Sequence, residues 1–120
     1  MKLLISVARQ LLTVFDDAGK VLREYPISTA KAGVGEISGS YQTPRGRHVI
    51  RAKIGASQPE NTVFVRRRPT GETWTPKLLE QFPGRDWILT RILWLSGCEP
   101  GRNRLGCVDT MRRYIYIHGS

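Results

Sequence analysis

The chain has 120 residues, of which 40% are hydrophobic, and this length is enough for one domain with its own hydrophobic core. The composition excludes a disordered protein, and the 12 glycines and 7 prolines favour many short strands and turns. The net charge of +9 is compatible with binding to polyanions or with a merely solvated basic surface, and charge alone does not decide between them.

The first quarter of the chain shows strand-like apolar runs separated by turn residues. We predict three strands, at residues 2–7, 11–15 and 21–27. Residues 17–20 predict a tight turn in which Gly19 can adopt a positive φ, so the second and third strands form a hairpin. Pro26 cannot donate a ladder hydrogen bond, which predicts an edge position or a bulge for its strand. Residues 28–42 are rich in small residues without a period and predict a loop.

A Thr-Pro-Arg-Gly turn at residues 43–46 opens the middle of the chain, because proline fixes one φ and glycine relaxes another. Strands are predicted at residues 48–54 and 61–65. The second of them runs into three arginines, at positions 66–68. These side chains could bind phosphate, but an exposed strand end is the interpretation we favour.

The remaining segments predict one helix and two strands. Thr75 is a suitable N-cap and Pro76 suits the first helical position, so we predict a helix at residues 76–82, ended by Pro83 and Gly84. The most apolar segment predicts a buried strand at residues 87–95, followed by a loop at 97–110. A final strand is predicted within residues 112–120, with Ile115 and Ile117 on one face and Tyr114, Tyr116 and His118 on the other.

These elements predict a mainly β fold, a sandwich or partly closed barrel of six to eight strands with one short helix, in a single domain spanning residues 1–120. Cys98 and Cys107 form no Cys-x-x-Cys pair, and the two histidines are not spaced to complete a zinc site with them. We therefore expect no metal site and no cofactor.

Five segments in this order carry a resemblance to a known family: Thr-Pro-Arg-Gly-Arg-His-Val-Ile at 43–50, the Trp-rich strand at 87–97, then 99–106, 108–113 and Tyr-Ile-Tyr-Ile-His-Gly at 114–119. Together they resemble the L,D-transpeptidase catalytic domain, also called the YkuD or ErfK/YbiS/YcfS/YnhG family. The resemblance covers essentially the whole chain and implies the L,D-transpeptidase-like β fold inferred above.

The resemblance implies acyl transfer on peptidoglycan stem peptides: a cysteine thiolate attacks a peptide carbonyl, forms a thioester and passes the acyl group to an amine. It implies that His118 is a catalytic-site residue and that Tyr116, Gly119 and Ser120 bind substrate. In the family, the nucleophile belongs to a Ser-His-Gly-Cys-x-Arg motif that follows the Ile-His-Gly strand, and residues 1–120 do not contain it. We therefore expect a domain truncated before that motif and inactive by itself.

Cys98 and Cys107 precede the histidine strand and lack the flanking Ser-His-Gly, so we do not expect either to replace the nucleophile. One alternative function is a non-catalytic wall-binding domain. A second, which we do not favour, is a nucleic-acid-binding module that uses Tyr114 and Tyr116 beside two arginines. The strand that ends at His118 predicts an unpaired sheet edge, and hence dimerisation or aggregation. The family works in the bacterial cell envelope, whereas residues 1–9 predict a strand rather than a signal peptide or membrane span.

Overall fold

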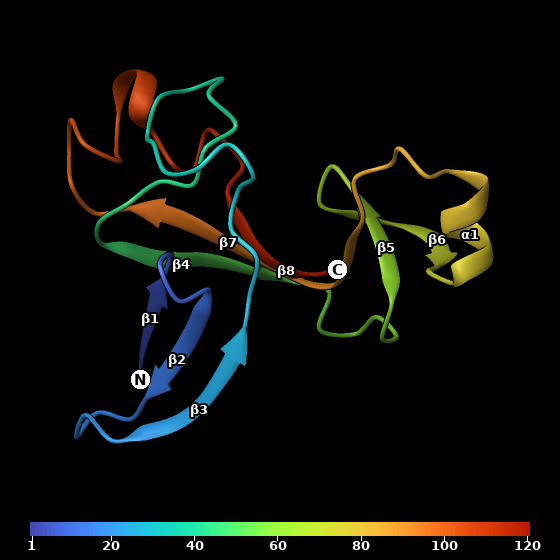
Figure 1. Cartoon of the computed structure of the whole chain (residues 1–120), viewed down its shortest axis with the longest axis horizontal. Helices are drawn as coiled ribbons and strands as arrows, with labels where there is room; N and C mark the ends of the chain where they lie inside the picture. The colour runs from blue at the N-terminus through green and yellow to red at the C-terminus, as the bar shows by residue number, and fades with distance from the viewer.

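The structure, a computed structural model, describes all residues from Met1 to Ser120 and contains two antiparallel β-sheets (Figure 1). The first sheet has the strand order β1-β2-β3, with β1 at Lys2–Ser6, β2 at Leu11–Phe15 and β3 at Val21–Pro26. The three predicted strands and the hairpin of β2 and β3 are confirmed. Gly19 has φ 85° in the turn, and Pro26 lies on an edge strand, as its missing N–H group predicted.

The second sheet is built around one long strand, β7. Its members are β4 at His48–Ile54, β5 at Thr62–Val65, β6 at Arg68–Thr73, β7 at Ile88–Gly97 and β8 at Tyr116–Gly119. Strands β4 and β5 pair with successive parts of β7 along one side, and β8 pairs along the other. The outer edge of β8 has no partner strand, so self-association through this edge stays a prediction.

A small lobe made of β5, β6 and the short helix α1 (Pro76–Gln81) projects from the main sheet, on the right of Figure 1. The helix begins as predicted, because the hydroxyl of Thr75 accepts a hydrogen bond from the Leu78 N–H at 3.2 Å. Strand β6 was not predicted. The sequence of β6 lacks apolar alternation, and this segment is extended because it pairs with β5. No helix of the fold is long and apolar enough to cross a membrane.

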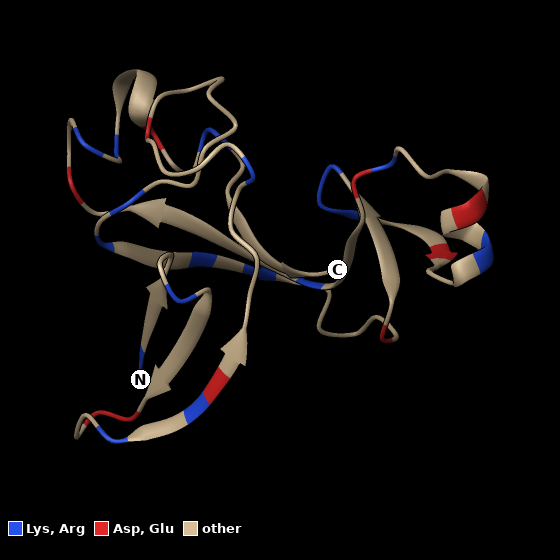
Figure 2. Ribbon diagram, in the orientation of Figure 1, with Lys and Arg blue, Asp and Glu red and all other residues tan.

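The run of three arginines follows the end of β5 as predicted, with Arg66 and Arg68 exposed and Arg67 half-buried. Arg66 and Arg67 have φ values of 51° and 65°, which places them in the tight turn between β5 and β6, and Arg68 begins β6. Lys and Arg residues occur in both sheets, in the lobe and in the loops rather than in one element (Figure 2). The charge of +9 is therefore distributed over the fold.

The last predicted strand starts later than expected. Residues 111–114 form a turn in which Tyr114 has φ 56°, and β8 begins only at Tyr116. The predicted alternation was therefore wrong for Tyr114, which does not continue the strand face of Tyr116 and His118. In contrast, β7 is longer than predicted, and a bulge at Thr90, where φ is 70°, shifts its register with β8.

The hydrophobic core is small, and all of it except Leu12 of β2 lies in β5 and β7. Five apolar residues are buried: Leu12, Val63, Phe64, Leu89 and Ile92. The radius of gyration of 15.2 Å exceeds the value of about 13.6 Å expected for a compact domain of this length. The two sheets are therefore not packed closely over their whole faces. The space left between them forms the cleft described below.

Candidate functional site

His118 lies in β8, opposite Ile92 of the central strand β7, and its side chain is exposed. The Nδ1 atom lies 2.7 Å from the carbonyl oxygen of Gly119, and a carbonyl can only accept, so Nδ1 carries the proton and donates. In the neutral imidazole protonated at Nδ1, Nε2 is an acceptor, and it has no partner in the protein. His118 can therefore accept a hydrogen bond or a proton from a bound molecule.

Tyr116 shares β8 with His118, but its phenol is already engaged. The Nη1 group of Arg67 donates to the Tyr116 hydroxyl at 3.0 Å, and the ring packs edge-on against Trp94 with centroids 6.0 Å apart. The phenol and the neighbouring aromatic rings hold the Arg67 guanidinium, and the Tyr116 hydrogen bond raises the pKa of Arg67. Tyr116 therefore ties the turn between β5 and β6 to β8.

Gly119 is required by close packing within the sheet. A Cβ at this position would lie 2.8 Å from the carbonyl oxygen of Leu89, so no larger residue fits without a backbone shift. Ser120 follows Gly119 and is exposed. The tight approach of β8 to β7 fixes the position of His118.

A cleft of about 1350 Å³ separates the first sheet from β8. All four residues predicted for the site line it, namely Tyr116, His118, Gly119 and Ser120. Its other walls come from β2, from the end of β3 and from the loop of residues 27–43. The structure therefore brings together the predicted site residues at a cavity large enough for a peptide.

The two thiols lie away from this cleft. Cys98 follows the C-terminal end of β7, where its N–H donates to the Arg47 carbonyl. His118 pairs with Ile92, which lies further back in the same strand. Cys98 comes six positions after Ile92, which corresponds to about 20 Å along a strand. Cys107 lies in the 3-10 turn Gly106–Val108, and neither thiol lines the cleft. Both are free and exposed, and neither hydrogen-bonds to His118.

Sequence comparison decides the family. The family model of YkuD, described as the L,D-transpeptidase catalytic domain, matches residues 1–120. The chain belongs to this family. No curated protein and no solved structure gave a match. The mainly β architecture of two antiparallel sheets and one short helix agrees with the fold expected of an L,D-transpeptidase domain.

Two polar residues that the sequence analysis missed organise this L,D-transpeptidase domain. Asn103, fully buried in the loop between β7 and β8, donates from Nδ2 to the carbonyls of Arg45 and Arg47, both at 3.0 Å. Arg113 donates to the carbonyls of Gly35 and Gln42, at 3.2 and 2.6 Å. Both bonds of Arg113 reach the loop that forms a cleft wall. No local pattern signals either residue, because their partners are distant in sequence.

His48, predicted as a polar residue at a strand start, fastens β4 to the segment that leads into β8. The Nδ1–H group donates to the Gly46 carbonyl at 3.1 Å, so Nε2 accepts from the hydroxyl of buried Thr110 at 2.9 Å. Burial lowers the pKa of His48 below its usual value, and this outweighs the Gly46 contact and the charges of Glu99 and Glu36, which act in the opposite direction. The L,D-transpeptidase fold therefore holds His48 neutral.

This arrangement predicts a loss of stability on mild acidification. An unfolded histidine binds its proton near pH 6.5, whereas native His48 does so only at lower pH. The unfolded state thus binds more protons in that window, so stabilisation present above about pH 6.5 is lost as the pH falls through the native pKa. Urea unfolding at pH 7.5 and pH 5.5 measures this slope. His48→Gln should flatten the slope and the matched His118→Gln should retain it; an equally steep slope in His48→Gln would refute the assignment.

Proposed function

We propose that this protein acts on peptidoglycan stem peptides by cysteine acyl transfer, and that residues 1–120 form the wall of the site that carries His118. The observation that carries the proposal is the free Nε2 atom of His118, a residue that lines a peptide-sized cleft in a chain of the L,D-transpeptidase family. A bound peptide N–H group or amine would donate a hydrogen bond to this acceptor. Tyr116, Gly119 and Ser120 would form the adjoining substrate surface.

The proposed reaction has two steps. A thiol gives up its proton and the thiolate attacks the carbonyl carbon of the stem peptide; the C–N bond breaks, and the departing amine takes up the proton that the thiol lost. The resulting thioester is then attacked by the acceptor amine, which loses a proton, and the thiolate is released. His118 supplies a proton acceptor beside these groups. Neither Cys98 nor Cys107 supplies the thiolate, because neither lines the cleft.

A polypeptide of residues 1–120 is therefore expected to bind a stem peptide without turning it over. This expectation equally describes a non-catalytic wall-binding domain, and the position of the two thiols is the observation that favours that second candidate. The two candidates share the cleft and its ligand, and differ only in whether a thiolate is brought to His118.

The test is to titrate the chain with a synthetic stem peptide by calorimetry and to record its intact mass afterwards. We expect reversible binding, no acyl adduct on the 13.6 kDa chain, and about tenfold weaker binding by His118→Ala, the effect of one lost hydrogen bond. Cys98→Ser and Cys107→Ser should bind as the unchanged chain does. Absence of binding would refute the peptide site, and an acyl adduct on either cysteine would refute the assignment of the thiols.

A further inference from the structure

Two tyrosines at the cleft combine an unusual backbone with an exposed ring. Tyr41 has φ 57° and is 87% exposed, and Tyr114 has φ 56° and is 56% exposed. A left-handed backbone is uncommon for bulky residues, so surrounding contacts must hold both positions. Both residues line the same cleft as His118. Their rings contribute little to the core, and the sequence resemblance assigns no role to either of them.

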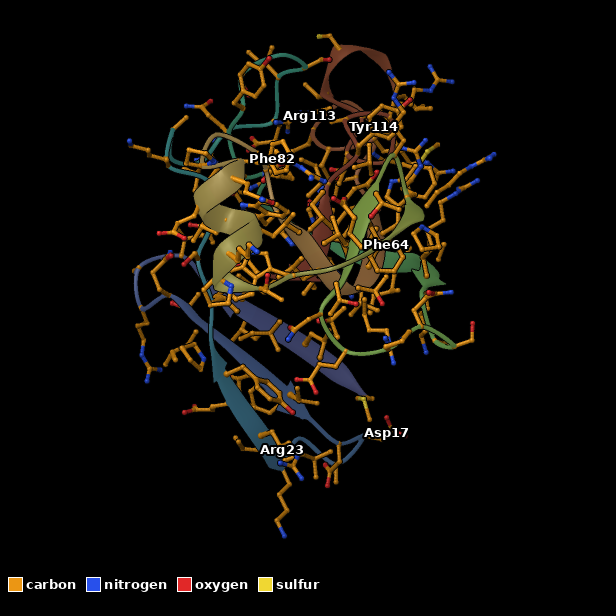
Figure 3. All side chains as sticks on the ribbon, turned by 90° about the vertical axis from the view of Figure 1, so that its right-hand side faces the viewer. Asp17, Arg23, Phe64, Phe82, Arg113 and Tyr114 are labelled. Carbon is orange, nitrogen blue, oxygen red and sulfur yellow. The ribbon has the colours of Figure 1, made fainter.

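Arg113 holds the segment around Tyr41. Its guanidinium donates to the hydroxyl of Ser40 at 3.3 Å and to the carbonyl of Gln42 at 2.6 Å, the residues on either side of Tyr41. Burial lowers the pKa of Arg113, as expected for a guanidinium enclosed by the loop that it binds. These two hydrogen bonds hold the backbone on either side of Tyr41 and thereby fix the point from which its ring projects. Figure 3 shows Arg113 and Tyr114 close together, at the end of the molecule away from Asp17 and Arg23.

Tyr114 is held by a different arginine. The Arg67 guanidinium carbon lies 4.5 Å from the centroid of the Tyr114 ring and 5.0 Å from that of Trp94. Trp94 itself lies 6.0 Å from Tyr114, between ring centroids, and its Nε1–H donates to the Met111 carbonyl at 3.1 Å. These contacts fix the orientation of Tyr114, and the residue remains 56% exposed at the cleft that it helps to line.

A sugar ring is the ligand that best suits two fixed, exposed tyrosines. The apolar face of a pyranose can stack on each aromatic ring, and its hydroxyls can bond to the phenols. Nucleobases also stack on aromatic rings, but single-stranded nucleic acid needs a continuous cationic groove as well. The charged residues that line the cleft are Lys31, Asp86, Arg112 and Arg113, and the last of these is engaged with the loop. This lining favours a glycan over nucleic acid.

We propose that Tyr41 and Tyr114 form a glycan subsite that takes the sugar to which the stem peptide is attached. The proposal rests on the proposed function and names a second part of its substrate. Tyr114 lies four residues before His118, so their Cα atoms are at most about 13 Å apart. An extended peptide of four residues covers a similar length. A stem peptide that reaches His118 can thus place its sugar at the tyrosines.

The experiment compares two ligands: a stem peptide alone, and the same peptide joined to the disaccharide of the glycan chain. We expect the unchanged protein to bind the glycosylated peptide about tenfold more tightly, the order of one ring stacked on an aromatic side chain. Tyr41→Gly should lower that affinity to the level of the free peptide. Glycine suits the left-handed backbone, so this variant is expected to fold. Tyr25→Ala, a half-exposed tyrosine of β3 outside the cleft, is the matched control and should retain the preference.

The possible outcomes separate the two proposals. Equal affinity for both ligands, or an undiminished preference in Tyr41→Gly, overturns the glycan subsite and leaves peptide binding intact. Failure to bind either ligand overturns the proposed function and the subsite together. Displacement of the glycosylated peptide by oligothymidylate, dependent on Tyr41, overturns the subsite in favour of nucleic-acid stacking.

Discussion

Phe64→Ala is expected to lower the free energy of unfolding by about 3 to 5 kcal/mol, the range for removing a buried aromatic ring. Phe64 is 1% exposed and is the largest of the five buried apolar residues. Its ring lies against the backbone at Gly55, where an added Cβ would come within 2.7 Å of Cζ. Domains of this size have a total stability of about 5 to 15 kcal/mol, so this single change removes a large fraction of it.

The consequences of Phe64→Ala extend to the site because Phe64 pairs with Ile88 at the start of β7. This contact joins the lobe of β5, β6 and α1 to the strand that carries β8. Urea unfolding measures the effect. The matched control is Phe82→Ala, since Phe82 is 47% exposed at the end of α1 and should cost less than about 1 kcal/mol. Figure 3 labels both rings. Similar losses in the two variants would contradict the position assigned to the core.

Local sequence patterns predict most of the secondary structure. Strands β2 and β4 have the predicted bounds. The helix cap at Thr75 was also predicted correctly, because the preference for a hydroxyl residue at the N-cap and for proline at the next position depends only on neighbouring residues. Strand β6 escaped prediction because Arg68–Thr73 has no apolar period and is extended only through pairing with β5. The prediction of a strand at Tyr114 was wrong for the opposite reason. Its segment alternates between apolar and polar residues as a strand does, but tertiary contacts hold Tyr114 in a turn.

The sequence predicted the residues of the candidate site that lie on the last strand, but not the residues that hold the surrounding loops. The position of His118 follows from the last strand and the family resemblance, and the structure places it at the cleft with its predicted neighbours. Arg113 was not predictable as a support for Tyr41, because its partners lie 71 to 78 residues earlier in the chain. The contacts of Asn103 with the segment before β4 span 56 and 58 residues. Such pairings depend on the arrangement of the sheets, which a local pattern does not determine.

Asn103→Ala is the second change expected to have a large effect, a loss of about 3 kcal/mol in the free energy of unfolding. The side chain is fully buried, and its Oδ1 atom accepts from the Glu99 N–H at 2.9 Å while Nδ2 donates to the Arg45 carbonyl at 3.0 Å. The Glu99 N–H and the Arg45 carbonyl have no other hydrogen-bond partner in the fold. Leaving a buried backbone group without a partner costs about 1 to 3 kcal/mol. The Arg47 carbonyl retains its bond from the Cys98 N–H.

The loss of Asn103 should also loosen the segment that positions His118. The Asn103 carbonyl accepts from Thr110 N–H at 2.9 Å, and Thr110 in turn bonds His48, so the asparagine, β4 and the approach to β8 form one connected network. Asn103→Asp preserves the shape of the side chain but turns a carboxylate oxygen toward the Arg45 and Arg47 carbonyls, so it should be at least as destabilising as Asn103→Ala.

The control is Asn61→Gly, at the other asparagine of the chain. Asn61 is exposed and has φ 64°, which glycine adopts easily, so this change should be nearly neutral. Urea unfolding, with stem-peptide binding measured on the same samples, tests the network; a loss below about 1 kcal/mol in Asn103→Ala would show that water replaces the lost bonds.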